Sequence, residues 1–295
     1  DAVSLVSHLQ FQLGQQSHPT QRREIFKELI TTQLDRLNNP EMAFLSASRA
    51  FQEFPTDDEL LQQLEEIAVR ADCVDELSDV LEMALDKSLP PARIVDIHVK
   101  IAELLWASDA RRASSHLRRV LSIDAGHKKA RRLLASLLET AGQWQQAAEL
   151  LEPVAQAGGG ADQWMQLARL REKAGQRELA TAAIKSALAD LGDDPDALDI
   201  LARLLEQQKN WQELDTVLQR RAQCAHSEED RLDVLLGWAQ LSEERELPRE
   251  ALRRYQHILQ IDPDCRPALT ALERLARKHG ELLLCAHALE RLCSM

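Results

Sequence analysis

The sequence predicts an all-α protein, a right-handed α-solenoid of about eight helix-turn-helix repeats. Three observations favour this fold class. A short apolar motif recurs at nearly constant spacing, each copy divides into two amphipathic stretches, and glycines and prolines fall between the stretches at matching places. A period of roughly 20 to 50 residues is typical of a solenoid. Such a repeat cannot bury its apolar face alone, so the repeats must stack on one another.

The recurring motif is a small or aliphatic residue followed four and seven residues later by further apolar residues. Its eight copies begin at Ala43, Leu77, Ala113, Ala147, Ala180, Leu214, Ala251 and Cys285. Subtracting successive positions gives steps of 34, 36, 34, 33, 34, 37 and 34. A length of 295 residues would by itself suggest about two globular domains. The regular period predicts instead one array without an interdomain linker.

The array is expected to start in the middle of a repeat. Residues 1–20 form a partial repeat, a trailing helix, because Leu5, Leu9 and Leu13 share one helical stripe. The array then occupies residues 21–295, with repeats at approximately 21–55, 56–90, 91–125, 126–159, 160–193, 194–227, 228–263 and 264–295. The last repeat has no further polar helix to cover it, although terminal repeats are normally capped. We therefore expect either a longer parent protein or self-association through the ends.

Each repeat is predicted to be two helices joined by a tight turn. In the fifth repeat the first helical face carries Trp164, Leu167, Ala168 and Arg171, and the second carries Ala180, Ala183, Ile184 and Ala187. Spacings of three and four residues are those of amphipathic helices. Gly142, Gly175 and Gly280 each lie five residues before a motif, where a left-handed helix stop is expected. Pro153 falls inside a second helix and is predicted to bend or end it.

Composition excludes several classes of protein. Charged residues make up 28% and apolar residues 44%, which fits a soluble chain with a buried core. A net charge of −12 opposes general affinity for nucleic acid or anionic lipid. The five cysteines show no paired spacing, which favours reduced thiols and a cytoplasmic location, with a removed leader or anchor left open. The preference for arginine over lysine hints at a GC-rich bacterial genome.

No motif in the sequence indicates catalysis, so we expect a protein that is not an enzyme and uses no cofactor. The sequence contains no paired-histidine zinc motif, phosphate loop, dinucleotide fingerprint or glycine-flanked nucleophilic serine. Cys265, His279, Cys285, His287 and Cys293 lack the short paired spacing of metal ligands, and no metal is expected. The five tryptophans are interpreted as packing residues rather than stacking platforms for bases.

A run of basic residues interrupts this acidic chain. The run comprises Arg111, Arg112, Arg118, Arg119, Lys128, Lys129 and Arg131. It has two interpretations. As a secondary site it could grip an acidic peptide or a phosphate through bidentate arginine contacts. As ordinary structure it is the solvated face of two helices and the turn between them.

The repeats resemble the tetratricopeptide repeat family, of a bacterial type. The family pattern is matched best by Trp164, Leu167, Ala168, Ala180, Ile184 and Ala187, and by Trp238, Ala239, Ala251, Tyr255, Ile258 and Pro263. The resemblance covers roughly residues 22 to 293. Individual copies are degenerate: alanine often replaces glycine, and Leu77 and Leu214 stand where a small residue is usual. The resemblance to the family is specific because all eight copies of the motif agree with it.

The resemblance also implies a partner-binding surface on the first helix of each repeat, where family members line a concave groove. The implied residues are Arg132, Ser136, Glu139, Met165, Arg169, Glu172, Asp199, Arg203, Glu206, Gln240 and Arg274. Arginine and glutamate three residues apart on one helix, as at Arg169 with Glu172 and Arg203 with Glu206, are spaced so that they can pair. A self-neutralised helix surface is the alternative interpretation. The lysine and asparagine set with which some members clamp chaperone tails is not reproduced at Glu28, Thr32, Gln62, Arg132 and Ser136.

The expected function is that of a non-catalytic scaffold or adaptor. It would bind a peptide or helix of a partner protein, possibly of mixed charge, along the concave groove. Two alternatives stay open. A helical-repeat protein that binds RNA is favoured only by the basic run, and a regulatory arm of a larger enzyme would need chemistry outside these residues. No membrane span is expected, because no apolar run approaches the roughly 18 residues required.

Overall fold

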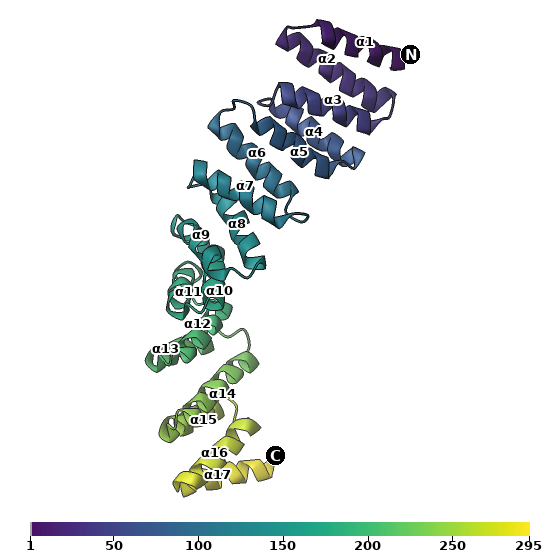
Figure 1. Ribbon diagram of the computed structural model, residues 1–295. Helices are drawn as coiled ribbons and strands as arrows, with labels where there is room; N and C mark the ends of the chain where they lie inside the picture. The colour runs from purple at the N-terminus through teal and green to yellow at the C-terminus, as the bar shows by residue number, and fades with distance from the viewer. Residues whose placement is uncertain (1) are drawn as a thin grey trace. The chain divides into compact units, whose positions relative to one another are not determined.

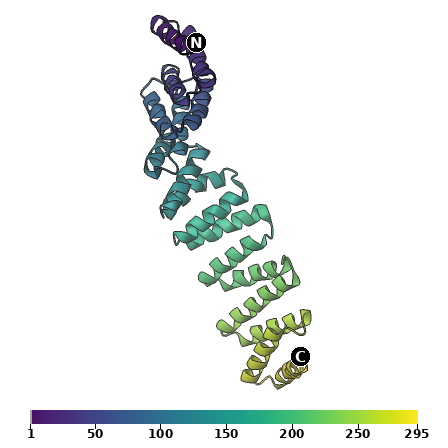
Figure 2. The same cartoon turned by 90° about the vertical axis from the view of Figure 1, so that its right-hand side faces the viewer.

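The computed structural model describes residues 2–295, and all regular structure in that range is helical. Figures 1 and 2 show the helices following one another along the chain. The first eight helices and a π-helical turn are α1 (Ala2–Gln15), α2 (Pro19–Thr31), η1 (Thr32–Arg36), α3 (Pro40–Glu53), α4 (Asp58–Ala71), α5 (Val74–Leu85), α6 (Pro91–Leu104), α7 (Ala110–Ile123) and α8 (Lys128–Thr140). The remaining nine are α9 (Trp144–Gln156), α10 (Gly160–Lys173), α11 (Arg177–Leu191), α12 (Pro195–Gln207), α13 (Trp211–Gln223), α14 (Glu228–Glu244), α15 (Pro248–Ile261), α16 (Arg266–His279) and α17 (Leu282–Ser294). The all-α prediction is confirmed.

The chain divides into two compact units, residues 1–143 and 144–295. The division falls between α8 and α9, inside the repeat expected at 126–159. Within each unit, consecutive helices pack against each other. The second unit contains four hairpins, α10 with α11, α12 with α13, α14 with α15 and α16 with α17, each with a first and a second helix.

The recurring motif marks the core, as the sequence predicted. All eight motif residues are buried, and Ala43, Ala113, Ala147, Ala180 and Ala251 are completely shielded from solvent. Alanine fits here because a small side chain allows two helices of a hairpin to approach closely. In the last repeats Tyr255, Leu269 and Leu272 join the same buried cluster. The tyrosine hydroxyl stays satisfied by donating to Glu243 Oε1 at 2.6 Å.

The joints between paired helices are left-handed turns. Gly142, Gly175 and Gly280 have φ of 72°, 75° and 76°, which confirms the predicted helix stops. Asn38, Asp72, Lys209 and Glu246 also have positive φ, and each also lies five residues before a motif. At Gly175 the amides of Gly175 and Gln176 donate to the carbonyls of Glu172 and Arg171, a Schellman motif. Six of the eight repeats therefore turn with the same hydrogen bonds, with or without glycine, whereas the joint at Asn38 follows the π-helical turn η1 and closes through Asn39 N–H to the carbonyl of Gln33.

Pro153 does not end its helix, because α9 continues through it to Gln156. The helix nevertheless stops within one turn of the proline. The trailing helix expected in residues 1–20 corresponds to α1, on which Leu9 is buried.

Candidate partner-binding site

Ion pairs connect helices of neighbouring repeats in two parallel rows. On the first helices, Arg203 Nη2 of α12 lies 2.8 Å from Glu172 Oε2 of α10, and Arg274 Nη2 of α16 lies 2.6 Å from Glu243 Oε2 of α14. On the second helices, Lys185 of α11 pairs with Glu213 of α13 at 2.5 Å. First helices and second helices thus form separate layers of the second unit.

The pairing of arginine and glutamate within one helix, which the spacing allows, is not formed at Arg203 or Arg169 in residues 2–295. Arg203 reaches back to Glu172 on the preceding first helix rather than to Glu206 on its own. Arg169 has no ion-pair partner among residues 2–295. The sequence could show that arginine and glutamate recur on one face, but the stacking distance between repeats decides which two meet.

The predicted surface residues of the second unit lie on its first helices. Met165, Arg169 and Glu172 are on α10, Asp199, Arg203 and Glu206 on α12, Gln240 on α14 and Arg274 on α16. Met165 and Glu172 are half-buried, and the other six are exposed. Arg132, Ser136 and Glu139 lie on α8 in the first unit, where Arg132 is exposed and the other two are half-buried. The predicted surface residues are therefore divided between the first unit, which holds three of them, and the second unit, which holds eight.

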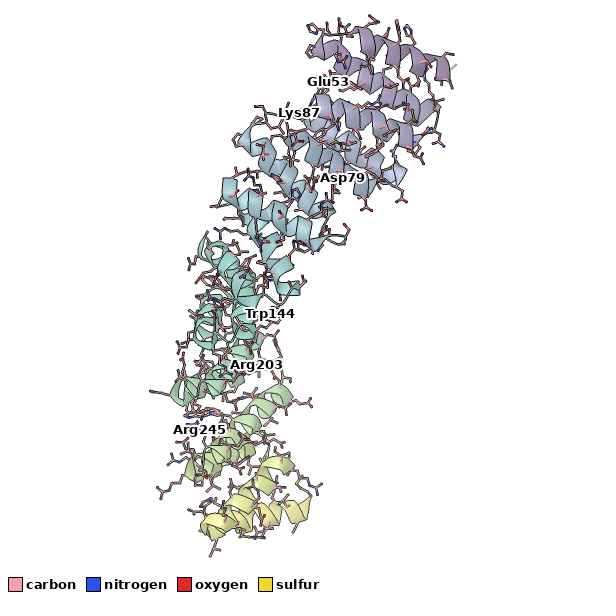
Figure 3. The ribbon with its side chains drawn as sticks, viewed as in Figure 1. Glu53, Asp79, Lys87, Trp144, Arg203 and Arg245 are labelled. Atoms are coloured by element: carbon pink, nitrogen blue, oxygen red, sulfur yellow. The ribbon has the colours of Figure 1, made fainter. Side chains whose placement is uncertain are left out.

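A groove lies between α12 and α14 and brings four of the predicted residues together. Its volume is about 370 Å³, and Asp199, Arg203, Glu206 and Gln240 line it. The floor is apolar and consists of Ala202, Leu214, Leu218, Val234 and Leu241. Gly237 also lines the groove, and a Cβ atom built there would meet nothing within 4 Å. We call this the first-layer groove; Figure 3 labels Arg203 at its edge.

The first-layer groove is predominantly acidic. Of its charged residues, Asp199 is neutralised by the nearly buried Arg221 at 2.9 Å, and Arg203 is neutralised by Glu172. Glu206, Asp233 and Glu244 are exposed and have no ion-pair partner within the described part of the chain. An apolar floor with three unpaired carboxylates suits a segment that carries both apolar and basic side chains.

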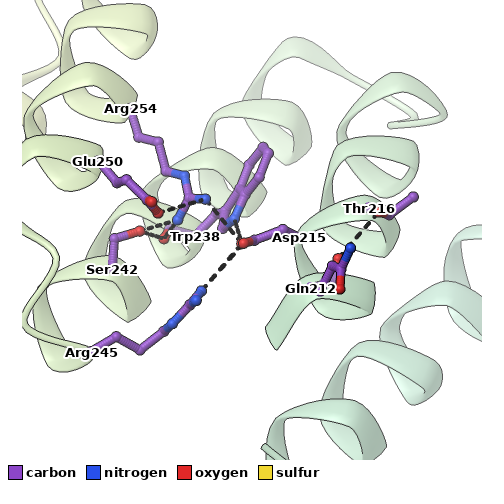
Figure 4. A network of polar contacts seen from close by, with 8 residues as sticks. All are labelled: Gln212, Asp215, Thr216, Trp238, Ser242, Arg245, Glu250 and Arg254. Carbon is purple, nitrogen blue, oxygen red and sulfur yellow. Dashed lines mark hydrogen bonds and ion pairs between the residues drawn. The ribbon is translucent and has the colours of Figure 1, made fainter. Parts of the chain in front are cut away.

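Asp215 on α13 holds together a polar network that the sequence analysis missed (Figure 4). Its Oδ1 accepts hydrogen bonds from Trp238 Nε1 at 2.7 Å and from Arg254 Nη2 at 2.9 Å, and Arg245 Nη1 lies 3.4 Å away. The guanidinium carbon of Arg254 lies 4.3 Å from the centre of the Trp238 ring. Burial lowers the pKa of Arg254, and the charge of Asp215 opposes that shift. No spacing in the sequence reveals this network, because its members come from α13, α14, α15 and the turn after α14.

The basic run lies on α7 and at the start of α8 and is partly neutralised. Arg112 pairs with Glu82 at 2.8 Å and with Asp79, the residue labelled in Figure 3, at 3.1 Å. Lys129 pairs with Glu103 at 2.6 Å, and Arg131 Nε donates to the carbonyl of Ala125. Arg111, Arg118, Arg119 and Lys128 are exposed without an ion-pair partner in residues 2–295.

Neither a metal centre nor a membrane span is found in the described residues. No group of three or more histidine, cysteine, aspartate or glutamate side chains in residues 2–295 could hold a metal ion. The five cysteines are free thiols. Over the same range, no helix combines the length and apolar character needed to cross a bilayer.

The consecutive helical hairpins with buried motif residues define the class of protein, a helical-repeat protein. Residues 104–170 match the family model described as Tetratricopeptide repeat. This segment, which runs from the end of α6 into α10, is similar to the tetratricopeptide repeat family. No curated protein matches the chain.

Several solved structures are similar to the chain at low identity. YrrB, described as a TPR protein with an unusual peptide-binding site, is 19% identical with a TM-score of 0.43, over 59% of this chain and 90% of that one. MamA residues 41 to the end from Desulfovibrio magneticus RS-1 are 18% identical with a TM-score of 0.41, over 55% and 89%. A further MamA structure is 15% identical with a TM-score of 0.43, over 57% and 91%.

Proposed function

We propose that this protein is a non-catalytic scaffold that binds a peptide or helix of a partner protein in the first-layer groove. Stacked repeats of this kind present extended binding surfaces. The groove between α12 and α14 is the observation that carries the proposal, because it combines an apolar floor with charged walls. Apolar contacts would supply affinity, and charges at the rim would select the partner.

The charges of the groove specify the partner segment. Glu206, Asp233 and Glu244 call for lysine or arginine on the bound segment, which would alternate with apolar residues that contact Leu218, Val234 and Leu241. Arg203 is about half exposed even in its pair with Glu172, so it can also meet an acidic residue of the ligand. The proposed partner is therefore a mainly basic amphipathic segment.

Gly237 gives the groove a shape that a ligand can use. A glycine in a helix interior costs about 1 kcal/mol relative to alanine. Nothing in the structure fills the space beside its Cα atom. A bound segment could approach the α14 backbone closely at this point, which an added side chain would obstruct.

The test uses capture of partner proteins from a lysate, with cross-linking to locate the bound segment. Changing Glu206 and Glu244 to lysine is expected to weaken capture strongly, whereas changing the exposed Glu178 and Glu229 to lysine gives the same change in net charge without altering the groove. Gly237→Leu is expected to weaken capture while leaving the helix intact. If both groove variants capture the same proteins as the unaltered chain, the groove is not the binding site.

A further inference from the structure

A second groove lies in the other layer of the second unit, between α13 and α15, with α14 as its floor. It has a volume of about 370 Å³. Its lining residues are Gln219, Ala222, Gln223, Arg231, Leu235, Trp238, Arg253, Arg254 and His257. We call it the second-layer groove. The first-layer groove lies between the first helices α12 and α14, and the two grooves share one lining residue, Trp238.

The charge of the second-layer groove is opposite to that of the first. Three arginines and one histidine line it, and none of the lining residues is acidic. This is unusual in a chain with 48 acidic against 36 basic residues. Asp215 and Glu250 pair with Arg254 from outside the lining, whereas Arg231 and Arg253 have no such carboxylate in residues 2–295.

Two of the arginines are available to a ligand. Arg231 and Arg253 are exposed, and neither side chain has a hydrogen-bond or ion-pair partner within residues 2–295. Several other arginines of the second unit differ in this respect, because they form ion pairs with carboxylates. Arg220 pairs with Asp193, and Arg221 pairs with Asp230. An unpaired guanidinium offers its donors to carboxylate or phosphate oxygens in a bidentate arrangement.

The third arginine fixes the wall of the groove. Arg254 is largely buried, with 17% of its side chain exposed, and it is held by Asp215 and by Ser242 Oγ while it stacks on Trp238 (Figure 4). The network therefore presents the Trp238 ring and the Arg254 guanidinium in one orientation. Beside them, Leu235 and Ala222 supply apolar surface, and the amides of Gln219 and Gln223 supply donors and acceptors.

We propose that the second-layer groove is a binding site for an acidic peptide segment. Carboxylate side chains of the segment would bind Arg231 and Arg253, and an adjacent apolar side chain would pack on Trp238 and Leu235. A nucleic acid is disfavoured because its affinity grows with the number of phosphates neutralised, and the chain as a whole is strongly acidic. Apart from Trp238, which lines both grooves, the two sites share no lining residue, so the protein can hold two segments of opposite charge.

The test measures fluorescence anisotropy of a labelled peptide, Glu-Leu-Glu-Glu-Leu-Glu, with the whole chain. We expect saturable binding that weakens roughly tenfold or more in the double variant Arg231→Glu with Arg253→Glu. The matched control is Arg177→Glu with Arg266→Glu, which changes net charge equally at two exposed, unpaired arginines outside the groove. Since none of these side chains has a partner, circular dichroism should show all variants folded.

Three outcomes would overturn the proposal. The first is that the acidic peptide fails to bind the unaltered chain. The second is that the control variant weakens binding as much as the groove variant does. The third is that a single-stranded oligonucleotide of equal charge binds more tightly than the peptide at the same salt concentration. A phosphoserine version of the peptide distinguishes phosphate from carboxylate as the preferred oxyanion. The variant Glu206→Lys with Glu244→Lys should leave binding of the acidic peptide unimpaired, which separates this result from that for the first-layer groove.

Discussion

Arg203 and Glu172 join two successive first helices, α12 and α10, through a contact of 2.8 Å between Nη2 and Oε2. Arg274 and Glu243 repeat this relationship two hairpins later, at 2.6 Å. In both pairs the glutamate is the more buried member and the arginine is more than half exposed. Both pairs therefore link successive first helices, and Arg203 stays accessible from the first-layer groove.

The contribution of this pair to stability is expected to be small. In a double-mutant cycle with Arg203→Gln and Glu172→Gln, the coupling free energy of unfolding should be about 0.2 to 1 kcal/mol, because exposed pairs are screened by solvent. Denaturant titration of the four proteins measures it. A coupling above about 2 kcal/mol would contradict this prediction and would imply that the pair is effectively desolvated.

The left-handed joints predict opposite effects for two substitutions. Lys209 has φ of 57°, so Lys209→Gly should raise the free energy of unfolding by up to about 1 kcal/mol through relief of an unfavourable conformation. Gly175→Ala should lower it by about 1 kcal/mol or more, because alanine is strained at the glycine's φ of 75°. Thermal denaturation of both variants checks the prediction. A gain for Gly175→Ala would be inconsistent with the assigned turn.

Removing the charge of Asp215 should destabilise the second unit. Asp215→Asn keeps an acceptor for Trp238 but removes the carboxylate that Arg245 and Arg254, which are 15% and 17% exposed, share, and Arg254 keeps only Glu250 at 3.7 Å. We expect a loss of about 2 kcal/mol, since breaking a largely buried pair leaves an uncompensated charge. Chemical denaturation followed by tryptophan fluorescence measures it. Asp193→Asn, which removes the partner of the more exposed Arg220, is the control and should cost less than about 1 kcal/mol.

His98 predicts a pH dependence for the first unit. Its Nδ1 lies 2.9 Å from Nδ1 of His116, and burial together with that neighbour lowers the pKa of His98 to about 4. Between the ordinary value of 6.5 and about 4, the unfolded chain therefore binds a proton at this position that the folded chain does not. Stability should be complete above pH 6.5 and should fall as the pH drops towards 4. His98→Asn should flatten this part of the profile, and an unchanged slope in that variant would refute the assignment.

The fold was largely predictable because it depends on local periodicity. The buried motif residues, the paired helices and the glycine joints all follow from spacings of three, four and about 34 residues along the chain. The joints at Lys209 and Glu246 were not predicted from the sequence, because lysine and glutamate do not favour positive φ. There the Schellman hydrogen bonds and the packing of the adjoining helices impose the turn.

The candidate sites depend on relations that the sequence does not encode locally. The sequence by itself determined the helical hairpins, the buried faces and the recurrence of arginine and glutamate on the first helices, since each follows from the geometry of one helix. Tertiary structure decided that Arg203 meets Glu172 rather than Glu206, that Asp215 gathers groups from α14 and α15, and that Arg231 and Arg253 share a groove. Those relations are set by the stacking of one repeat on the next, which brings together side chains that are 20 or more residues apart.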